Sequence, residues 1–331
     1  MRVTQYSALE PYKKNLQDIQ QRQVSNQMRI ATGKDILNLS DSPDKIPDIK
    51  KLSSIISSNK EFIKIIENQI SEFQFSEIQM QGISDLMQKT QQTSIDATQV
   101  GNAGNLPILA NTVKGYIEDI IRNANSDYNG SFLYAGTKTK PESFDTAIPN
   151  TNDMPFELVQ NPPTATNPSG LSVVFKGNFE DKAINKDSTS SDVINTKADE
   201  IFGTGGTQFF DSIISLYNLL AYKSDGTKRT SSDLLTKEES GKLNDLQEKI
   251  SNFSKQIDQT IARNAARSNR FDTLKLQITE ENTRLGDYLS SKQDADVANV
   301  SLELAKDSNA LQYALQVGGN IIPMSLLNFL K

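Results

Sequence analysis

The sequence predicts a mainly α-helical protein with a small β-rich insert, in which helices near the two ends of the chain form a long antiparallel coiled-coil rod. Two long stretches, one in each half of the chain, carry apolar residues in steps of three and four. Between them the sequence changes to prolines, glycines and short apolar runs, which are typical of strands and turns. Steps of three and four are typical of helices that pair along an apolar seam, so these observations define the fold class.

The stretch in the C-terminal half runs from Leu243 to Tyr288. Its seam positions are Leu243, Leu246, Ile250, Phe253, Ile257, Thr260, Asn264, Arg267, Phe271, Leu274, Ile278, Glu281, Leu285 and Tyr288. A helix over about 241–290 would be roughly 75 Å long at about 1.5 Å per residue, which is longer than a compact domain requires. Polar residues inside such a seam often fix the register of the pair.

The stretch in the N-terminal half has the same rhythm. Its seam positions are Ile49, Leu52, Ile56, Asn59, Ile63, Ile66, Ile70, Phe73, Glu77, Met80, Ser84 and Met87. Either helix alone would leave an apolar stripe in water. We therefore expect 49–87 and 243–288 to pack against each other in antiparallel orientation.

Composition limits the function. The 331 residues carry a net charge of −6, which disfavours a phosphate backbone as partner, so we expect no nucleic acid. The chain has no cysteine, histidine or tryptophan, which removes disulfides, thiolate metal sites and the commonest general base. No apolar run reaches the roughly 20 residues of a membrane helix, and 1–14 has no signal-peptide core. We expect no catalytic residues, no cofactor, no metal site and no membrane contact.

Four helical segments are predicted outside the middle of the chain. The first covers about 1–30 and should be marginal alone, with Pro11 tolerable only in a first turn. The sequence 32–43 breaks it, and the next helix runs to about Val100. A third begins near Leu106, and the last helical face starts at Val297 and is interrupted by Asp307.

The middle of the chain predicts strands and one short helix. Asn129-Gly130 indicates a tight turn before a strand at 132–134, and 156–159 and 171–175 indicate two more strands. Six of the eleven prolines lie between Pro141 and Pro168, which excludes a helix there. We also expect a strand at 200–202, a helix over 209–220, and a polar linker at 222–237.

Three features resemble ligand sites but favour simpler interpretations. The segment 125–130 opens like a calcium loop, yet Gly136 stands where the bidentate glutamate belongs, so we expect a turn. The glycine-rich 203–207 lacks the lysine of a phosphate-binding loop. Arg263, Arg267 and Arg270 line one helical face, which is either a solvated face or a contact to carboxylates of a neighbouring subunit.

Several motifs resemble those of the flagellin superfamily. The break between the first two helices resembles its helix-break motif at Thr32, Gly33, Lys34, Asn38, Asp41 and Pro43, with Ser42 in place of a second aspartate. Ala266–Arg270 resembles the Ala-Arg-x-Asn-Arg signature of the descending helix, and 294–298 and 325–330 resemble the C-terminal tail. The start of the chain, 129–136, and 200–203 leading into 209–211 resemble the hook–filament junction proteins, the FlgL type, more than filament flagellin. The resemblance covers 1–136 and about 200–331.

The resemblance implies a structural, non-enzymatic adaptor on the extracellular flagellum. Such subunits travel unfolded through the export channel without a cleaved signal peptide, and their terminal helices stack into the wall of a tube. The implied partners are flagellin, another hook-associated protein on the hook side, copies of the chain in a ring and an export chaperone. It implies inner assembly helices at 1–42 and 291–331, a rod at 43–136 and 236–290, and an outward insert at 137–235.

The sequence also predicts which residues make these contacts. At the N-terminus the interface residues are Leu9, Tyr12, Leu16 and Ile19. At the C-terminus they are Val297, Val300, Leu304, Leu311, Leu315, Leu326, Leu327, Phe329 and Leu330. So apolar a C-terminal end needs a partner or folds back on its own chain, and periodicity leaves both open. Asn264, Arg267, Asn269 and Arg270 are the polar contact residues of the rod.

Three other functions stay open on the sequence alone. A filament flagellin would share the helices and polymerise without limit. An enzyme acting through carboxylates of the insert lacks the usual catalytic residue types but is not excluded. A cytoplasmic coiled-coil scaffold is the third alternative.

Overall fold

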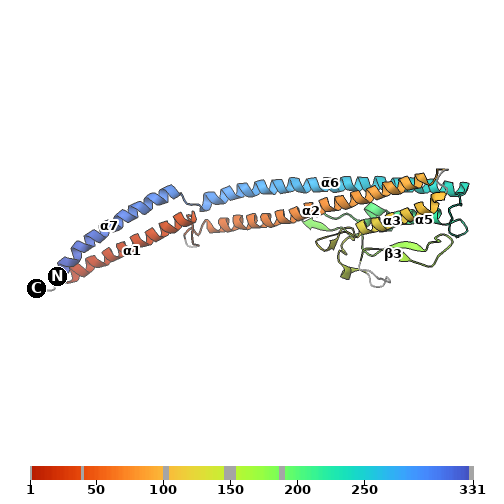
Figure 1. The fold of residues 1–331 in the computed structure, drawn as a ribbon. Helices are drawn as coiled ribbons and strands as arrows, with labels where there is room; N and C mark the ends of the chain where they lie inside the picture. Colours follow the sequence, from red (N-terminus) through yellow and green to blue (C-terminus); the bar gives the residue numbers. More distant parts are fainter. Residues whose placement is uncertain (1, 39–40, 100–103, 145–153, 186–190, 328–331) are drawn as a thin grey trace. The chain divides into compact units, whose positions relative to one another are not determined.

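The computed structural model describes residues 2–38, 41–99, 104–144, 154–185 and 191–327 (Figure 1). Its helices are α1 (Arg2–Thr32), α2 (Ile46–Asp96), α3 (Leu106–Ala124), α4 (Ala198–Phe202), α5 (Gln208–Ala221), α6 (Lys237–Gln293) and α7 (Val297–Leu327). Three antiparallel two-stranded sheets pair β1 (Asp127–Tyr128) with β2 (Ser131–Phe132), β3 (Phe156–Gln160) with β4 (Leu171–Phe175), and β5 (Ala183–Asn185) with β6 (Ser191–Val193). The mainly α-helical class with a small β-rich insert is confirmed.

The chain forms two compact units. Unit 1 contains residues 1–63 and 276–331, and unit 2 contains 64–275. Helices α2 and α6 each contribute one end to unit 1 and the other to unit 2.

Within each unit, α2 and α6 pair in antiparallel orientation, as predicted. In unit 2, Lys275 contacts Glu67 at 2.9 Å, the rings of Phe271 and Phe73 lie 5.6 Å apart, and Asp258 accepts a hydrogen bond from Ser84. Residue numbers fall along α6 as they rise along α2. In unit 1, Asn59 donates to Asn282 at 3.0 Å.

The contact between Asn59 and Asn282 corrects the predicted seam near the end of α6. Glu281 and Tyr288 are exposed there, and the Tyr288 ring lies 5.3 Å from the Lys292 ammonium instead of facing α2. A helix has about 3.6 residues per turn, so a strict three-four count drifts by about 20° per heptad. Over the length of α6, that drift moves the contact to the next residue.

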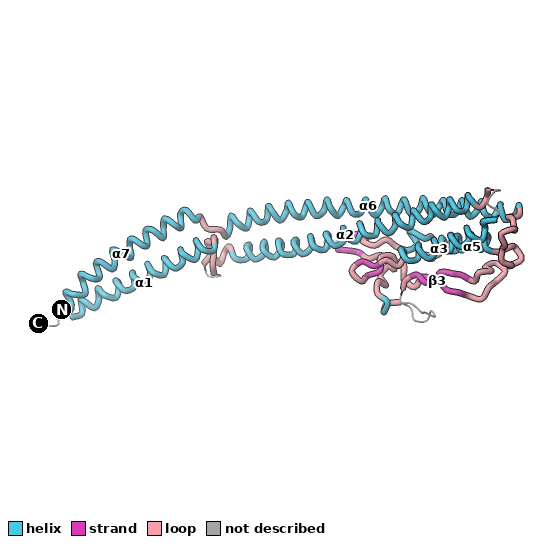
Figure 2. The backbone as a smooth tube through the Cα atoms, viewed as in Figure 1, coloured by secondary structure: helices cyan, strands magenta, loops and turns pink. Residues whose placement is uncertain are grey.

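Unit 2 contains an apolar core built around phenylalanines. Helices α3 and α5 lie side by side next to α2 and α6 (Figure 2). The ring of Phe202 lies 5.2 Å from that of Phe156 and 4.8 Å from that of Phe210, and all three side chains are fully buried. The predicted helix at 209–220 is confirmed as α5, and its buried face supplies much of this core.

The two predicted strands at 156–159 and 171–175 are confirmed as β3 and β4. Phe156 pairs with Phe175 at one end of this hairpin and Gln160 with Leu171 at the other. Asn125, at the end of α3, holds the hairpin through both of its amide atoms, which bond the Phe156 backbone N–H and carbonyl at 2.8 Å. The segment that resembled a calcium loop therefore anchors a strand.

The strand predicted at 132–134 is shorter than expected. Asn129 (φ 52°) and Gly130 (φ 75°) form the predicted tight turn, and pairing stops at Phe132. Tyr134 is fully buried and its hydroxyl donates to the Ser76 carbonyl at 3.1 Å, so this residue anchors the loop to α2 rather than extending a sheet.

Other local predictions were wrong. Residues 200–202 belong to α4, because Ala198 and Ile201 lie on one buried helical face. Pro11 lies inside α1, where its exposed position lets water satisfy the carbonyl that loses its donor. α2 begins at Ile46 and ends at Asp96. Among its described residues, the proline-rich stretch contains the 3₁₀ turn Pro141–Ser143. Asp307 interrupts the apolar face of α7, as predicted, while the helix continues through it.

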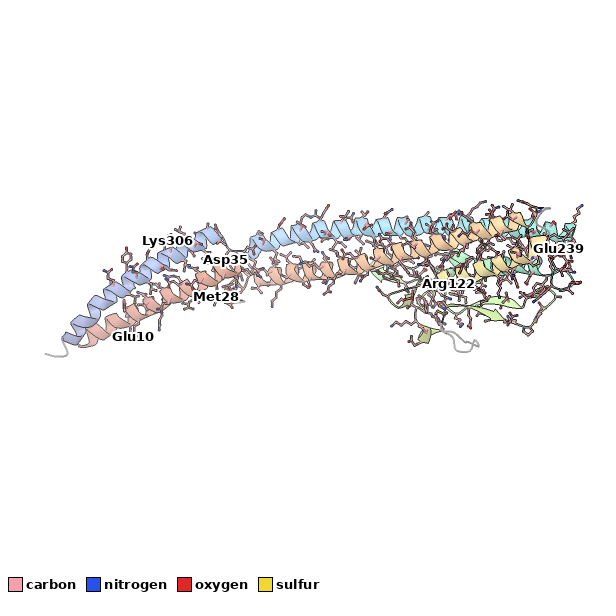
Figure 3. The ribbon with its side chains drawn as sticks, in the orientation of Figure 1. Glu10, Met28, Asp35, Arg122, Glu239 and Lys306 are labelled. Atoms are coloured by element: carbon pink, nitrogen blue, oxygen red, sulfur yellow. The ribbon has the colours of Figure 1, made fainter. Side chains whose placement is uncertain are left out.

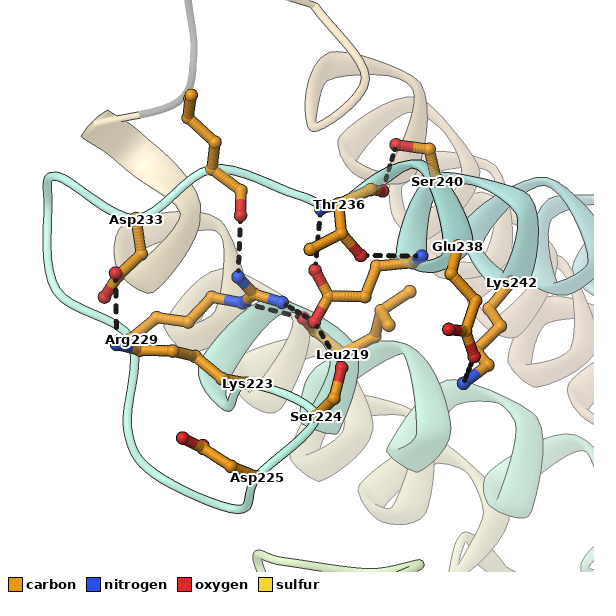
Figure 4. Close-up of polar contacts among 12 residues, drawn as sticks. Leu219, Lys223, Ser224, Asp225, Arg229, Asp233, Thr236, Glu238, Ser240 and Lys242 are labelled. Atoms are coloured by element: carbon orange, nitrogen blue, oxygen red, sulfur yellow. Dashed lines mark hydrogen bonds and ion pairs between the residues drawn. The ribbon is translucent and has the colours of Figure 1, made fainter.

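The polar linker before α6 contains a buried ion pair (Figure 4). Arg229 Nη2 lies 2.5 Å from Glu239 Oε1, and Arg229 also donates to the carbonyls of Leu219 and Leu234. Thr236 and Glu239 bond each other's backbone N–H groups, which is a capping box at the start of α6. Burial raises the pKa of Glu239, but the Thr236 hydrogen bond and the Arg229 charge outweigh it, so the pKa is lowered overall.

Among the described residues, no helix combines the length and the apolarity that crossing a bilayer requires.

The paired terminal helices as a candidate assembly interface

In unit 1, helices α1 and α7 lie side by side in antiparallel orientation (Figure 2). The Tyr12 hydroxyl donates to the Ala314 carbonyl at 2.8 Å. Further along, Arg22 pairs with Asp307 at 2.9 Å and Arg29 lies 3.5 Å from Glu303. The terminal helices of one chain therefore cover part of each other's surface and pair several of its polar groups.

Several predicted interface residues take part in this pairing within the chain. Val300 is 2% exposed, and the half-buried residues along the same seam are Tyr12, Leu16, Ile19, Leu304 and Leu311. Val297 and Leu315 are more exposed, at 45% and 56%, and flank the seam. The side chains of Leu9, Leu326 and Leu327, and all of Phe329 and Leu330, lie outside the described residues.

Gly318 lets the two helices approach closely. A Cβ atom at this position would lie 2.0 Å from the Tyr12 hydroxyl oxygen. No side chain fits there unless Tyr12 moves. The phenol ring of α1 therefore lies in a notch on α7 that only glycine provides.

A second apolar stripe on each helix faces away from the pair. On α1 it consists of Val24 and Met28, which are 51% and 54% exposed; Figure 3 labels Met28. On α7 it consists of Leu302, Tyr313 and Val317, which are 54%, 68% and 52% exposed. At about 100° per residue these residues lie more than about 90° around their helix from the centre of the seam. We call these five residues the outer stripes.

The outer stripe of α7 was not predicted from the sequence. The prediction used one apolar face of this helix, and the spacing from Leu302 to Tyr313 and Val317, eleven and then four residues, was the signal that could have found the second. Both faces of α7 are apolar, so periodicity alone does not say which of them α1 covers.

The predicted helix-break motif connects the turn between α1 and α2 to the turn between α6 and α7. Gly33 adopts a left-handed conformation (φ 68°) and ends α1. Its carbonyl accepts a hydrogen bond from the Ala295 N–H at 2.9 Å, and the Asp35 N–H donates to the Gln293 carbonyl at 2.7 Å. Lys34 pairs with Asp294 as an isolated β-bridge. The turn between α1 and α2 is thereby fixed to the turn between α6 and α7.

The other residues of the motif shape the turn itself. Thr32 donates through its hydroxyl to the Met28 carbonyl, and the same oxygen accepts from the Lys34 N–H at 3.3 Å. One oxygen of Asp41 accepts from the backbone N–H groups of Leu37 and Asn38, at 2.9 and 2.7 Å. The side chains of Asn38 and Pro43 are exposed.

The four polar contact residues of α6 lie in unit 2, and two of them hold the insert. Arg267 donates to the Asn195 carbonyl at 2.9 Å, and Arg270 forms an ion pair with Asp192. Asn264 is buried and donates to the Phe73 carbonyl of α2, while Asn269 is exposed. The structure thus gives Arg267 and Arg270 partners inside the chain, next to β6.

The site has no arrangement that suggests catalysis or metal binding. Within the described parts of the chain, no three metal-ligating side chains come together. The paired helices present an extended surface with exposed apolar residues outside the seam as well as along it.

Comparison with known proteins identifies the fold. No protein-family model matches the sequence, and no curated protein shows significant sequence similarity to it. Among solved structures, a putative flagellar hook-associated protein from Vibrio parahaemolyticus matches with a TM-score of 0.60 and 17% identity, covering 77% of this chain and 100% of that one. Flagellar hook-associated protein-3 from Legionella pneumophila matches with a TM-score of 0.53 and 11% identity, over 73% and 97% of the two chains.

The chain therefore has the fold of flagellar hook-associated proteins. FlgL from Bacillus cereus is also similar, with a TM-score of 0.46 and 14% identity over 73% of this chain and 99% of that one. The fold assignment rests on the two structures with higher scores. At the level of the fold, the resemblance to hook-associated proteins that the motifs predicted is confirmed.

Proposed function

We propose that this protein is a structural, non-enzymatic subunit of the bacterial flagellum that joins the hook, through another hook-associated protein, to the flagellin filament. The observation that carries the proposal is the combination of this fold with outer stripes on both terminal helices. A helix pair that is apolar on its outside as well as along its seam needs further helices to cover it. The partners we propose are flagellin, another hook-associated protein and copies of this chain.

The size of the outer stripes favours assembly in a ring over a stable contact between two subunits. Burying the exposed half of an aliphatic or aromatic side chain contributes about 1 kcal/mol, so the five residues together contribute about 5 kcal/mol. Losing rotational and translational freedom costs at least about 4 kcal/mol in a bimolecular association. A single contact would then be weak, whereas a subunit held by several neighbours would be stable.

The composition fits export in an unfolded state. The chain has no cysteine that could oxidise in transit, and its terminal helices are held by one seam rather than by a core. We propose that an export chaperone covers the apolar ends before secretion and that the mature protein lies on the extracellular flagellum. The predicted inner helices, rod and outward insert, with the boundaries given above, belong to the same proposal.

Reconstitution on isolated hooks tests the function. Purified protein is added to hooks that carry the other hook-associated protein, and flagellin is added afterwards. We expect the protein to bind hook ends in a fixed number of copies and then to permit filament growth. Unlimited polymerisation of the protein by itself would identify a filament flagellin, and failure to bind hook ends would contradict the proposal.

A matched pair of variants connects the assay to the outer stripes. Tyr313→Ser with Val317→Ser removes apolar surface that faces away from α1, and we expect hook binding to be lost. Ile78→Ser with Ile108→Ser, which removes two equally exposed apolar side chains of unit 2, is the control and should bind like the wild type. Equal binding by both variants would show that assembly does not use the outer stripes.

A further inference from the structure

The seam between α1 and α7 contains one layer of polar side chains. Asp307 is 8% exposed and Asn26 is 5% exposed, although both lie among apolar seam residues. Arg22 donates through Nε and Nη2 to one oxygen of Asp307, at 3.1 and 2.9 Å, and Asn26 donates to the other oxygen at 3.4 Å. The layer is internally satisfied: both carboxylate oxygens of Asp307 have donors.

The layer extends toward the end of α1. Arg29 donates to the Asn26 side-chain oxygen at 3.2 Å and forms ion pairs with Asp35 and Glu303. Asn26 therefore donates to α7 and accepts from α1 at the same time. This arrangement holds Asn26 in one orientation, with its donor aimed at Asp307.

Apart from the notch at Gly318, the other apolar residues of the seam do little to fix the alignment of α1 and α7. Leu16, Ile19, Leu304 and Leu311 are half-buried. Leucine and isoleucine side chains tolerate many partners of similar size. A shift of one heptad would separate Tyr12 from the Gly318 notch and break its hydrogen bond to Ala314, and both of these are uncharged contacts.

The same shift has a different effect on Asp307. A shift of one heptad toward the start of α1 would place Asn15 and Ile19 opposite Asp307 instead of Arg22 and Asn26. A shift the other way would place Arg29 and Gly33 there, so the residue that ends α1 would replace Asn26 and Arg29 would leave its position beside Glu303. In both cases the buried carboxylate loses the Asn26 donor, and in the first it also loses its charged donor, which is strongly unfavourable. A polar residue at a single seam position is a known way to fix register at some expense of stability.

We infer that Arg22, Asn26 and Asp307 are specificity-determining residues that set the register of α7 on the α1 of its own chain. The inference does not depend on flagellar function, since it concerns a contact within one subunit. As a consequence, the outer stripes can bind other helices, while the seam of α1 fits only α7 of the same chain in one register. The polar layer therefore keeps the α1–α7 contact within the chain distinct from contacts made through the outer stripes.

Distance measurement by pulsed electron spin resonance tests this register directly. The chain has no cysteine, so Lys14→Cys and Lys306→Cys, both at exposed positions, introduce unique sites for spin labels in the full-length protein. In the wild-type background we expect one dominant distance. In the Asn26→Leu, Asp307→Leu background we expect additional distances shifted by about 10 Å, the rise of one heptad, with helix content by circular dichroism unchanged.

Leu304→Ala is the matched control, because it weakens the same seam without touching the layer. It should keep the single wild-type distance even if the melting temperature falls. Three results would overturn the inference: no dominant distance in the wild type, an unshifted single distance after both leucine substitutions, or loss of helix content in that variant, which would make the layer a source of stability instead. Hook-binding data would leave the inference untouched, because the measurement uses the free subunit.

Discussion

The two units differ in how completely they bury their apolar side chains. Unit 2 buries several phenylalanines in a closed core between α3, α5, α4 and the ends of α2 and α6. The described helices of unit 1 form pairs, with a polar layer in the α1–α7 seam and outer stripes left in water. A closed core is sufficient for stability, whereas a helix pair of this kind is marginal. We therefore expect unit 2 to be the more stable unit, and we propose that the terminal helices of unit 1 contact partners.

The largest effect should come from the core of unit 2. Phe202→Ala removes a fully buried ring that touches Phe156 and Phe210, and such truncations cost about 3–5 kcal/mol. Leu16→Ala in α1 removes a half-buried side chain and should cost about 1 kcal/mol. Chemical denaturation measures both, and equal losses would contradict the comparison.

The buried ion pair should give the next largest effect. Arg229→Met leaves Glu239 buried without its cation, and breaking such a pair costs about 3–5 kcal/mol. Lys242→Met is the control, because its pair with Glu238 is on the surface, where water and salt screen the attraction and little stability is lost. Both substitutions remove one positive charge, so the difference between the two losses of unfolding free energy measures the effect of burial. If Lys242→Met were as harmful as Arg229→Met, the pair would not be part of the core of unit 2.

The ion pair between Arg229 and Glu239 predicts that the stability of unit 2 depends on pH. The pKa of Glu239 is lower in the folded chain than its ordinary value of about 4.3, so the unfolded chain takes up the proton first as pH falls. The stabilisation is present above that ordinary value and is lost as pH falls toward the folded pKa. We expect Glu239→Gln to be less stable than the wild type at pH 7 but to lose less stability between pH 5 and pH 3. Parallel pH profiles for the two proteins would contradict this.

A smaller effect is expected at the notch in unit 1. Gly318→Val places a side chain where the Tyr12 hydroxyl lies and should cost about 1–3 kcal/mol in the α1–α7 pair. Gly319→Val is the control, because a Cβ there meets nothing within 4 Å and the substitution changes only helix propensity. Neither should change the melting of unit 2. A Gly318→Val protein whose α1 amides exchange at the wild-type rate would argue against the notch.

The smallest effect on stability should accompany the largest effect on assembly. Tyr313→Ser with Val317→Ser changes exposed residues and should alter the free energy of unfolding by less than about 0.5 kcal/mol per site. Loss of hook binding with unchanged stability would place the outer stripes in the assembly surface. Loss of both together would place them in the subunit's own fold.

Periodicity predicted the parts of this fold that depend on local pattern. The long helices and the pairing of α2 with α6 follow from steps of three and four, and β3 and β4 follow from short apolar runs between turns. The helix-break motif was found from its residues, but its bonds to the α6–α7 turn join positions some 260 residues apart in the sequence and could not be read from spacing alone.

Several deciding contacts are distant in the sequence. The partner of Asp307, Arg22, lies near the other end of the chain, so the sequence shows Asp307 only as a polar residue on an apolar face. The Asn195 carbonyl that Arg267 binds could not be foreseen either, and the contact of Arg267 with a neighbouring subunit stays a prediction. Residues 200–202 were assigned to a strand, although α6 and the phenylalanine core favour a helical turn at this position.

Hydrogen exchange on the free and the assembled protein tests the difference between the two units most directly. In the free protein we expect the amides of α3 and α5 to exchange at the rate of global unfolding and those of α1 and α7 to exchange much faster through local opening. After assembly on hooks, α1 and α7 should become as protected as α3 and α5. Equal protection of all four helices in the free protein, or terminal helices that gain nothing on assembly, would contradict the account.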